Sequence, residues 1–164
     1  MQQSHCVRFA VTNSDFDGVF LNDIGQWSRP YEGKQTRVNG RSLIFVYGSL
    51  KRGFALHRHL SGQEFLSVAS TQPSYRLFDC GAYPAMVKVA VNGSSVKGEV
   101  FRVDQECLLR LDEVEGVKEG LYVRDFVPLC PPFETSRTIA WLFVPSTLGL
   151  SDCGSEWPAE QGRN

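Results

Sequence analysis

The stretch that decides the fold is Leu43–Leu50, with the sequence LIFVYGSL. Its first five residues form an unbroken run of aliphatic and aromatic side chains, which favour strands. An apolar run without polar alternation is typical of a strand that is buried on both faces. Gly48 interrupts the run. The sequence therefore predicts a central strand that is followed at once by a tight loop.

Short apolar segments separated by turn signals continue downstream of this strand. We expect a short helix over 55–60 and further strands over 75–78, 85–91, 96–103, 122–129 and 138–144. Asn92-Gly93 is typical of a hairpin turn, so the strands over 85–91 and 96–103 are expected to pair. Asp104 is expected to cap a helix that runs to about Val114. The prediction is an α+β fold, a small mixed β-barrel of about six strands with flanking helices.

The length of 164 residues is enough for one domain with its own core. Residues 1–40 carry scattered aromatic side chains among polar ones and show no sustained period, so we expect a partly ordered N-terminal extension. The domain itself is expected over 41–150. The polar stretch 151–164 is expected to form a loose C-terminal tail.

The composition argues against several classes of protein. A net charge of −1 gives no reason to expect a nucleic-acid or membrane partner. The five cysteines are widely spaced without a Cys-x-x-Cys pair, which argues against a disulfide framework and a metal site. No apolar run approaches the ~20 residues that span a bilayer, and the start lacks a signal-peptide pattern. We expect a cytoplasmic protein.

The loop after the first strand is a candidate binding site. Backbone N–H groups at the end of a buried strand, together with the Ser49 hydroxyl, can hold a carboxylate or an oxyanion. Gly48 permits close approach of a ligand, and Lys51 and Arg52 add positive potential nearby. The alternative is an ordinary turn before a basic helix start.

Acidic residues gather near the end of the predicted helix. Successive residues of a helix are about 100° apart. The apolar side of the predicted helix therefore carries Cys107, Leu108, Leu111 and Val114, and the opposite, charged side carries Glu106, Arg110 and Glu113. Glu115 falls on the apolar side if the helix persists that far. Burial would raise its pKa towards the range where a carboxyl group both accepts and donates protons. The alternative is that Gly116 has already ended the helix and Glu115 turns outwards.

The chain resembles the gamma-glutamylcyclotransferase-like superfamily, and within it the gamma-glutamylamine cyclotransferase and avirulence-induced-gene-like subgroup. Five segments carry the resemblance in the same order and spacing: FVYGSLKRG at 45–53, GAYPAM at 81–86, GEVFRV at 98–103, LDEVEG at 111–116 and LYVR at 121–124. The resemblance covers about residues 42–146. Residues 1–40 have no counterpart in it, and the insert at 117–120 lies beside Glu115.

The resemblance implies an enzyme of the transferase or lyase type that needs no metal and no cofactor. It would cyclise the glutamyl group of a small-molecule γ-glutamyl amine or related amide to 5-oxoproline and release the amine. Glu115 would be the base and acid. The candidate substrate-binding residues are Tyr47, Gly48, Ser49, Leu50, Tyr83, Tyr122 and Arg124. Core packing is the alternative role for Tyr83 and Tyr122, and an exposed strand position is the alternative for Arg124.

Two other functions stay open at this point. The chain could be a non-catalytic domain of the same fold that binds a small metabolite or a protein, because a fold alone does not establish function. It could also remove a γ-glutamyl group from a larger amine in a biosynthetic pathway. The sequence does not identify the leaving amine.

Overall fold

The structure is a computed structural model that describes residues 40–158 and, before them, two short strands. The chain divides into two compact units, residues 1–36 and 37–164. In the first unit, β1 (Phe20–Leu21) and β2 (Trp27–Ser28) pair in antiparallel fashion. The rest of the predicted N-terminal extension lies outside the described residues.

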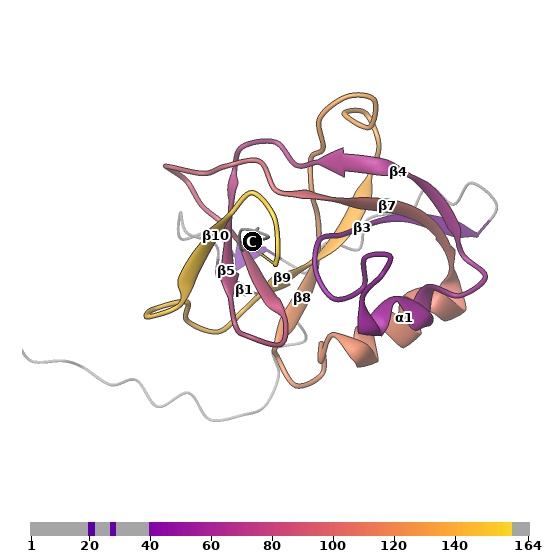
Figure 1. Ribbon diagram of the computed structural model, residues 1–164, viewed down its shortest axis with the longest axis horizontal. Helices are drawn as coiled ribbons and strands as arrows, with labels where there is room; N and C mark the ends of the chain where they lie inside the picture. The colour runs from indigo at the N-terminus through magenta and orange to yellow at the C-terminus, as the bar shows by residue number, and fades with distance from the viewer. Residues whose placement is uncertain (1–19, 22–26, 29–39, 159–164) are drawn as a thin grey trace, which may run out of the picture. The chain divides into compact units, whose positions relative to one another are not determined.

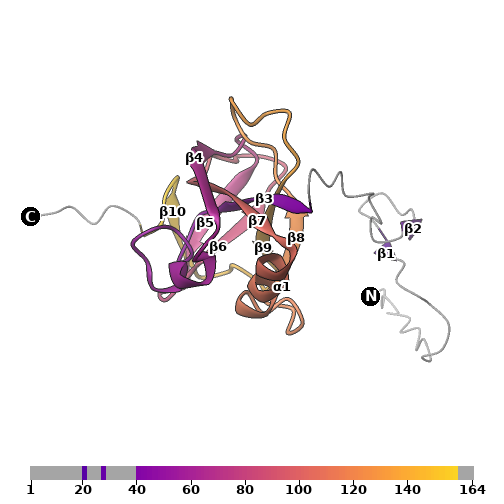
Figure 2. The same cartoon turned by 90° about the vertical axis from the view of Figure 1, so that its right-hand side faces the viewer.

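Within residues 40–158, the second unit contains two β-sheets, one 3₁₀ helix and one α-helix (Figure 1). The larger sheet has the order β4-β7-β3-β9-β8. Figure 2 shows its edge strands, β4 at the left and β8 at the right. Its strands are β3 (Arg41–Val46), β4 (Glu64–Ser70), β7 (Lys97–Asp104), β8 (Tyr122–Phe126) and β9 (Thr138–Phe143). The smaller sheet has the order β10-β5-β6 and consists of β5 (Tyr75–Asp79), β6 (Pro84–Lys88) and β10 (Ser151–Gly154). The helices are η1 (Ala55–Leu60) and α1 (Gln105–Val114).

The predicted central strand is confirmed as β3. It pairs with β7 in antiparallel fashion along its whole length and with β9 in parallel fashion, which makes the sheet mixed. Ile44 and Val46 belong to one apolar core, together with Leu108 of α1, whereas Phe45 belongs to a second core that contains Met86 of the small sheet. The side chains of β3 from Ile44 to Val46 are therefore buried on both faces, which explains why this part of the strand has no polar alternation.

The large sheet is the middle layer of the second unit. Its two apolar cores join it to α1 on one face and to the small sheet on the other. In Figure 1, α1 lies below β3 and β7, and β5 and β10 lie to their left. The helix begins as predicted, because the Asp104 carboxylate accepts a hydrogen bond of 2.7 Å from the Cys107 N–H. None of the helices in the described part of the chain is long and apolar enough to cross a membrane.

The α+β class is confirmed, but the predicted β-barrel is not. Residues 40–158 form eight strands in two separate sheets, and neither sheet closes on itself. The predicted hairpin of 85–91 with 96–103 is also wrong. Both edges of β7 are occupied by β3 and β4, and β6 pairs with β5 instead. The residues around Asn92-Gly93 carry the chain from the small sheet to the large one.

The prediction of a loose tail from Ser151 is wrong for residues 151–158. Ser151–Gly154 pairs with β5 as the edge strand β10, and Trp157 is buried in the second core. A short edge strand tolerates polar side chains, so the sequence of β10 lacks the apolar pattern that predicts a strand. Residues 159–164 lie outside the described part.

Candidate active site

A cavity of about 160 Å³ lies at the end of β3. Its lining residues are Phe45, Val46, Tyr47, Gly48, Ser49, Leu50, Leu56, Tyr83, Pro84, Val114, Glu115, Leu121, Tyr122 and Trp141. The fold thus brings together the predicted loop, the two predicted tyrosines and Glu115. Arg124 is the one predicted site residue that does not line the cavity.

The end of α1 places Glu115 in the cavity wall. The Glu115 N–H still donates a helical hydrogen bond of 2.9 Å to the Leu111 carbonyl, and its backbone angles are helical. Gly116 then ends the helix with a φ of +63°, a conformation that glycine adopts readily. Helical geometry therefore lasts one residue beyond Val114, so Glu115 faces the cavity as the helical period predicts.

The Glu115 carboxyl group is set for proton transfer near neutral pH. Burial raises its pKa from the ordinary 4.5 to about 7. Within residues 40–158, no hydrogen bond or ion pair holds the carboxylate. A carboxyl group with a pKa near the working pH can accept a proton in one step and return it in another.

Tyr47 and Tyr122 form walls of the cavity and stay neutral. The Tyr47 hydroxyl donates to the carbonyl of Trp141, and the Tyr122 hydroxyl donates to the carbonyl of Pro84 at 2.6 Å. Burial, with a further contribution from the negative charge of Glu115, raises the pKa of each phenol well above its usual value. Both hydroxyl groups thus donate their protons to backbone carbonyls. Because each phenol stays protonated, neither is suited to act as a base.

The loop Tyr47–Leu50 keeps backbone donors free for a ligand. Its carbonyls accept internal hydrogen bonds from the N–H groups of Lys51 and Leu56, at 3.0 and 3.1 Å. In the described part of the chain, the N–H groups of Ser49 and Leu50 donate to no backbone carbonyl. Such free N–H groups can hold a carboxylate or an oxyanion.

Packing against Pro84 requires a glycine in this loop. A Cβ on Gly48 would lie 2.5 Å from Cγ and 2.6 Å from Cδ of Pro84, well inside van der Waals contact. The proline ring is stiff and cannot move aside easily. Gly48 therefore lets the loop and the 80–84 segment close on each other, a role that the sequence reading did not identify.

Arg124 lies behind the cavity wall. Its Nε is 3.0 Å from Oδ1 of Asp112, and the indole N–H of Trp141 donates to the same oxygen at 3.0 Å. The carbonyl of Trp141 in turn accepts from Tyr47. Asp112 and Trp141 were not predicted as site residues, because an acid on a helix and a tryptophan in an apolar strand are common structural features.

Comparison with known proteins identifies the family. A model of the family described as "Gamma-glutamyl cyclotransferase, AIG2-like" matches residues 44–160, which include every residue that lines the cavity. The chain belongs to this cyclotransferase family. A putative gamma-glutamylcyclotransferase of Vibrio cholerae is 39% identical over 102 residues, which cover 62% of this chain and 80% of the relative. Gamma-glutamylaminecyclotransferase A of Danio rerio is 36% identical over 93 residues, or 52% of this chain and 57% of the relative's length.

Solved structures of the cyclotransferase fold resemble this one. An uncharacterized protein from Pyrococcus horikoshii aligns with a TM-score of 0.56 and 28% identity, covering 70% of this chain and 88% of that one. An AIG2-like protein from Mus musculus aligns with a TM-score of 0.55 and 25% identity, covering 68% of this chain and 85% of that one. The resemblance stated from the sequence motifs is therefore confirmed for family and fold.

Proposed function

We propose that this cyclotransferase-family chain converts a γ-glutamyl amine or a related small amide into 5-oxoproline and a free amine. One observation carries the proposal. A carboxyl group with a pKa of about 7 shares a cavity of about 160 Å³ with a loop that has free backbone N–H groups. The combination supplies a proton acceptor and donor beside a site for a negatively charged oxygen.

The reaction begins with proton removal. The ionised Glu115 carboxylate takes a proton from the α-ammonium group of the glutamyl substrate. The freed nitrogen attacks the side-chain carbonyl carbon and forms a five-membered ring with a tetrahedral centre. Glu115 gives its proton to the leaving nitrogen, the bond from the tetrahedral carbon to that nitrogen breaks, and the carbonyl re-forms. Glu115 then takes the second proton from the ring nitrogen and passes it to the released amine, which departs as an ammonium ion and leaves Glu115 ionised as at the start. Substrate atoms are fully accounted for in 5-oxoproline and the amine, and no water is consumed.

The loop Tyr47–Leu50 would orient the substrate. The N–H groups of Ser49 and Leu50 are the proposed donors to the substrate α-carboxylate or to the oxyanion that develops on the attacked carbonyl. Holding the nitrogen near the carbonyl turns the ring closure into a favourable intramolecular step. The chain supplies orientation and proton transfer, so the proposal calls for no metal and no organic cofactor. A cytoplasmic location, expected from the sequence, is part of the same proposal.

Tyr83 and Tyr122 are proposed to border the substrate. Their ring centroids are 6.3 Å apart in an edge-to-face arrangement. The hydrogen bond from Tyr122 to Pro84 joins the wall formed by β8 to the wall formed by residues 83–84. Because Arg124 pairs with Asp112, we propose that it supports the wall and does not contact the substrate.

The test is 5-oxoproline release from a panel of γ-glutamyl amines, γ-glutamyl dipeptides and glutathione. The variants are Glu115→Gln and, as a matched control, Glu113→Gln, which replaces an exposed carboxylate on the same helix. We expect Glu115→Gln to lose about 10²–10⁴-fold in kcat, the usual contribution of a general acid and base, and Glu113→Gln to keep full turnover. Equal product release by wild type and Glu115→Gln would refute the role of Glu115. Tight binding of a γ-glutamyl compound by wild type without product would refute catalysis and favour a binding domain.

A further inference from the structure

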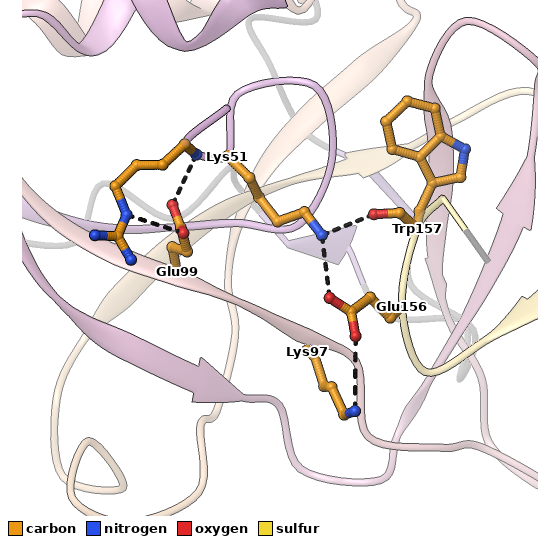
Figure 3. Close-up of polar contacts among 6 residues, drawn as sticks. Lys51, Lys97, Glu99, Glu156 and Trp157 are labelled. Atoms are coloured by element: carbon orange, nitrogen blue, oxygen red, sulfur yellow. Dashed lines mark hydrogen bonds and ion pairs between the residues drawn. The ribbon is translucent and has the colours of Figure 1, made fainter. Parts of the chain in front are cut away.

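A second cavity of about 590 Å³ is bordered by the residues that directly follow the loop Tyr47–Leu50. Lys51 and Arg52 line it on one side, and Lys97, Glu99 and Glu156 complete a cluster of charges around it. Figure 3 shows this cluster, with the Lys51 amine directed towards Glu156 and Trp157. The charged side chains of the cluster pair with one another, so the cluster holds the residues after the loop Tyr47–Leu50 against the rest of the fold.

Lys51 is buried and held by the C-terminal segment. Only 7% of the residue is exposed. Its Nζ donates to the Trp157 carbonyl at 2.7 Å and lies 3.6 Å from the Glu156 carboxylate. Burial of an ammonium group is costly unless it is paired and hydrogen-bonded, so these two contacts determine where the lysine can lie. Because Lys51 directly follows Leu50, they also restrict the end of the loop.

The adjacent residue is fixed to the large sheet. The Arg52 N–H and the Arg52 Nε contact the two carboxylate oxygens of Glu99, each at 3.0 Å. Glu99 lies on β7 and is 9% exposed. The Arg52 guanidinium also lies over the Phe65 ring at 3.5 Å. Thus the two residues after the loop are held by two separate parts of the fold.

Trp157 joins the same segment to the second wall of the active-site cavity. Its indole N–H donates to Oδ1 of Asp79 at 3.0 Å, and this oxygen also accepts from the Gly81 N–H at 2.8 Å. These two hydrogen bonds lower the pKa of Asp79, as expected for a carboxylate stabilised in its charged form. Asp79 is the last residue of β5, and the turn after it leads to Tyr83 in the cavity wall.

We propose that Trp157 is a positioning residue of the active site. Its carbonyl holds the loop Tyr47–Leu50 through Lys51, and its indole N–H holds the turn before Tyr83 through Asp79. Trp157 itself does not line the cavity, so it acts through the residues that do. The proposal rests on the proposed function, because its catalytic consequence requires that the two walls bind a γ-glutamyl substrate.

Two variants test the two contacts separately. Trp157→Phe removes the indole N–H and retains the backbone carbonyl, and Lys51→Met removes the ammonium group and retains an unbranched stem. The matched control is Arg76→Met, which breaks the exposed ion pair between Arg76 and Asp152 of β10 and touches neither wall. In 5-oxoproline release, we expect KM to rise about tenfold or more in both variants, because an ångström-scale displacement of a binding group can cost up to about 10²-fold. We expect the KM of Arg76→Met to stay within about twofold of the wild-type KM.

The pH profile separates positioning from a general loss of structure. Neither Trp157 nor Lys51 contacts Glu115, so the midpoint of the kcat/KM profile should stay at the wild-type value in both variants. The variant Asp79→Ala removes the acceptor of the Trp157 indole bond. Because it deletes the same interaction, the double variant Trp157→Phe/Asp79→Ala should lose little more than Asp79→Ala alone. Additive losses, or an unchanged KM in Trp157→Phe and Lys51→Met, would overturn the proposal.

Hydrogen exchange in the unliganded chain makes the test independent of turnover. We expect faster exchange in peptides covering 47–56 in Lys51→Met and 80–84 in Trp157→Phe, with no change in 47–56 for Arg76→Met. Unchanged exchange in both loops would refute the positioning role even if the chain is an active cyclotransferase. Faster exchange combined with no 5-oxoproline from wild type would instead refute the proposed function and retain the structural role of Trp157.

Discussion

Replacing Glu115 by Gln should stabilise the protein at high pH while it removes activity. A carboxyl group whose pKa rises on folding binds protons more tightly in the native state than in the unfolded state. Its contribution to stability is fully present below the unfolded pKa of 4.5 and is lost as the pH rises through the native pKa of about 7. Gln resembles the protonated carboxyl group in shape and has no charge to bury, so the variant avoids this loss.

The size of the effect follows from the two pKa values. The native pKa of about 7 against an ordinary 4.5 corresponds, at about 1.4 kcal/mol for each unit, to a penalty of up to about 3 kcal/mol above pH 7. Because Glu115 keeps partial solvent exposure, we expect a gain of about 2 kcal/mol for Glu115→Gln at pH 8. Below pH 4.5 the gain should vanish.

Urea unfolding of wild type, Glu115→Gln and Glu113→Gln between pH 5 and pH 8.5 measures this difference. The free energy of unfolding of Glu115→Gln should exceed that of wild type by an amount that grows with pH and levels off above about 7. The exposed Glu113 serves as the control for loss of one negative charge from the same helix. A gain for Glu115→Gln that is the same at every pH would refute the assignment of a raised pKa to Glu115.

Three further outcomes are expected. The kcat/KM for 5-oxoproline release should rise with pH through about 7, because the ionised form of Glu115 is the proposed base. A flat profile between pH 5.5 and 8.5 would contradict that role. Gly48→Ala should destabilise the fold by about 1–3 kcal/mol, because its Cβ would overlap Pro84, and the double variant with Pro84→Ala should recover part of that loss in the same urea assay. Asp104→Ala should lower the free energy of unfolding by about 1 kcal/mol, because the helix cap is lost. Asp104→Asn keeps a hydrogen-bond acceptor and should lower it less; equal losses in the two variants would argue against the cap.

The strands that the sequence predicted share a strong local signal. The run Leu43–Tyr47 is apolar on both faces because both faces are buried, and the caps and period of α1 follow from interactions within one helix. The strands β4 and β10 were missed because each lies at a sheet edge, where part of the surface is solvated and polar side chains are tolerated. The pairing of β6 and β7 was misjudged because the partners of a strand are set by tertiary packing and not by the turn between two segments.

The candidate site was accessible from the sequence in part. Tyr47–Leu50 and Glu115 were found by independent arguments, the end of a buried strand and the face of a helix, and the fold places them in one cavity. Arg124 was misplaced because sequence position gives the strand but not the side-chain partner, which is Asp112. Trp141 and Trp157 gave no signal of their own, since their roles depend on contacts between segments far apart in the chain.

The pairing of β3 has a consequence for the order in which the elements of the molecule fold. Ile44 pairs with Phe101 on one side and with Ile139 on the other, and Tyr47 bonds to Trp141, 94 residues away. Contacts that join such distant points of a chain form slowly, because long loops must close before the contacts contribute. Helix α1 is local and can form early, whereas the cavity requires the complete large sheet. During refolding, recovery of helical signal should therefore precede recovery of catalytic turnover, which would report the last stage of assembly.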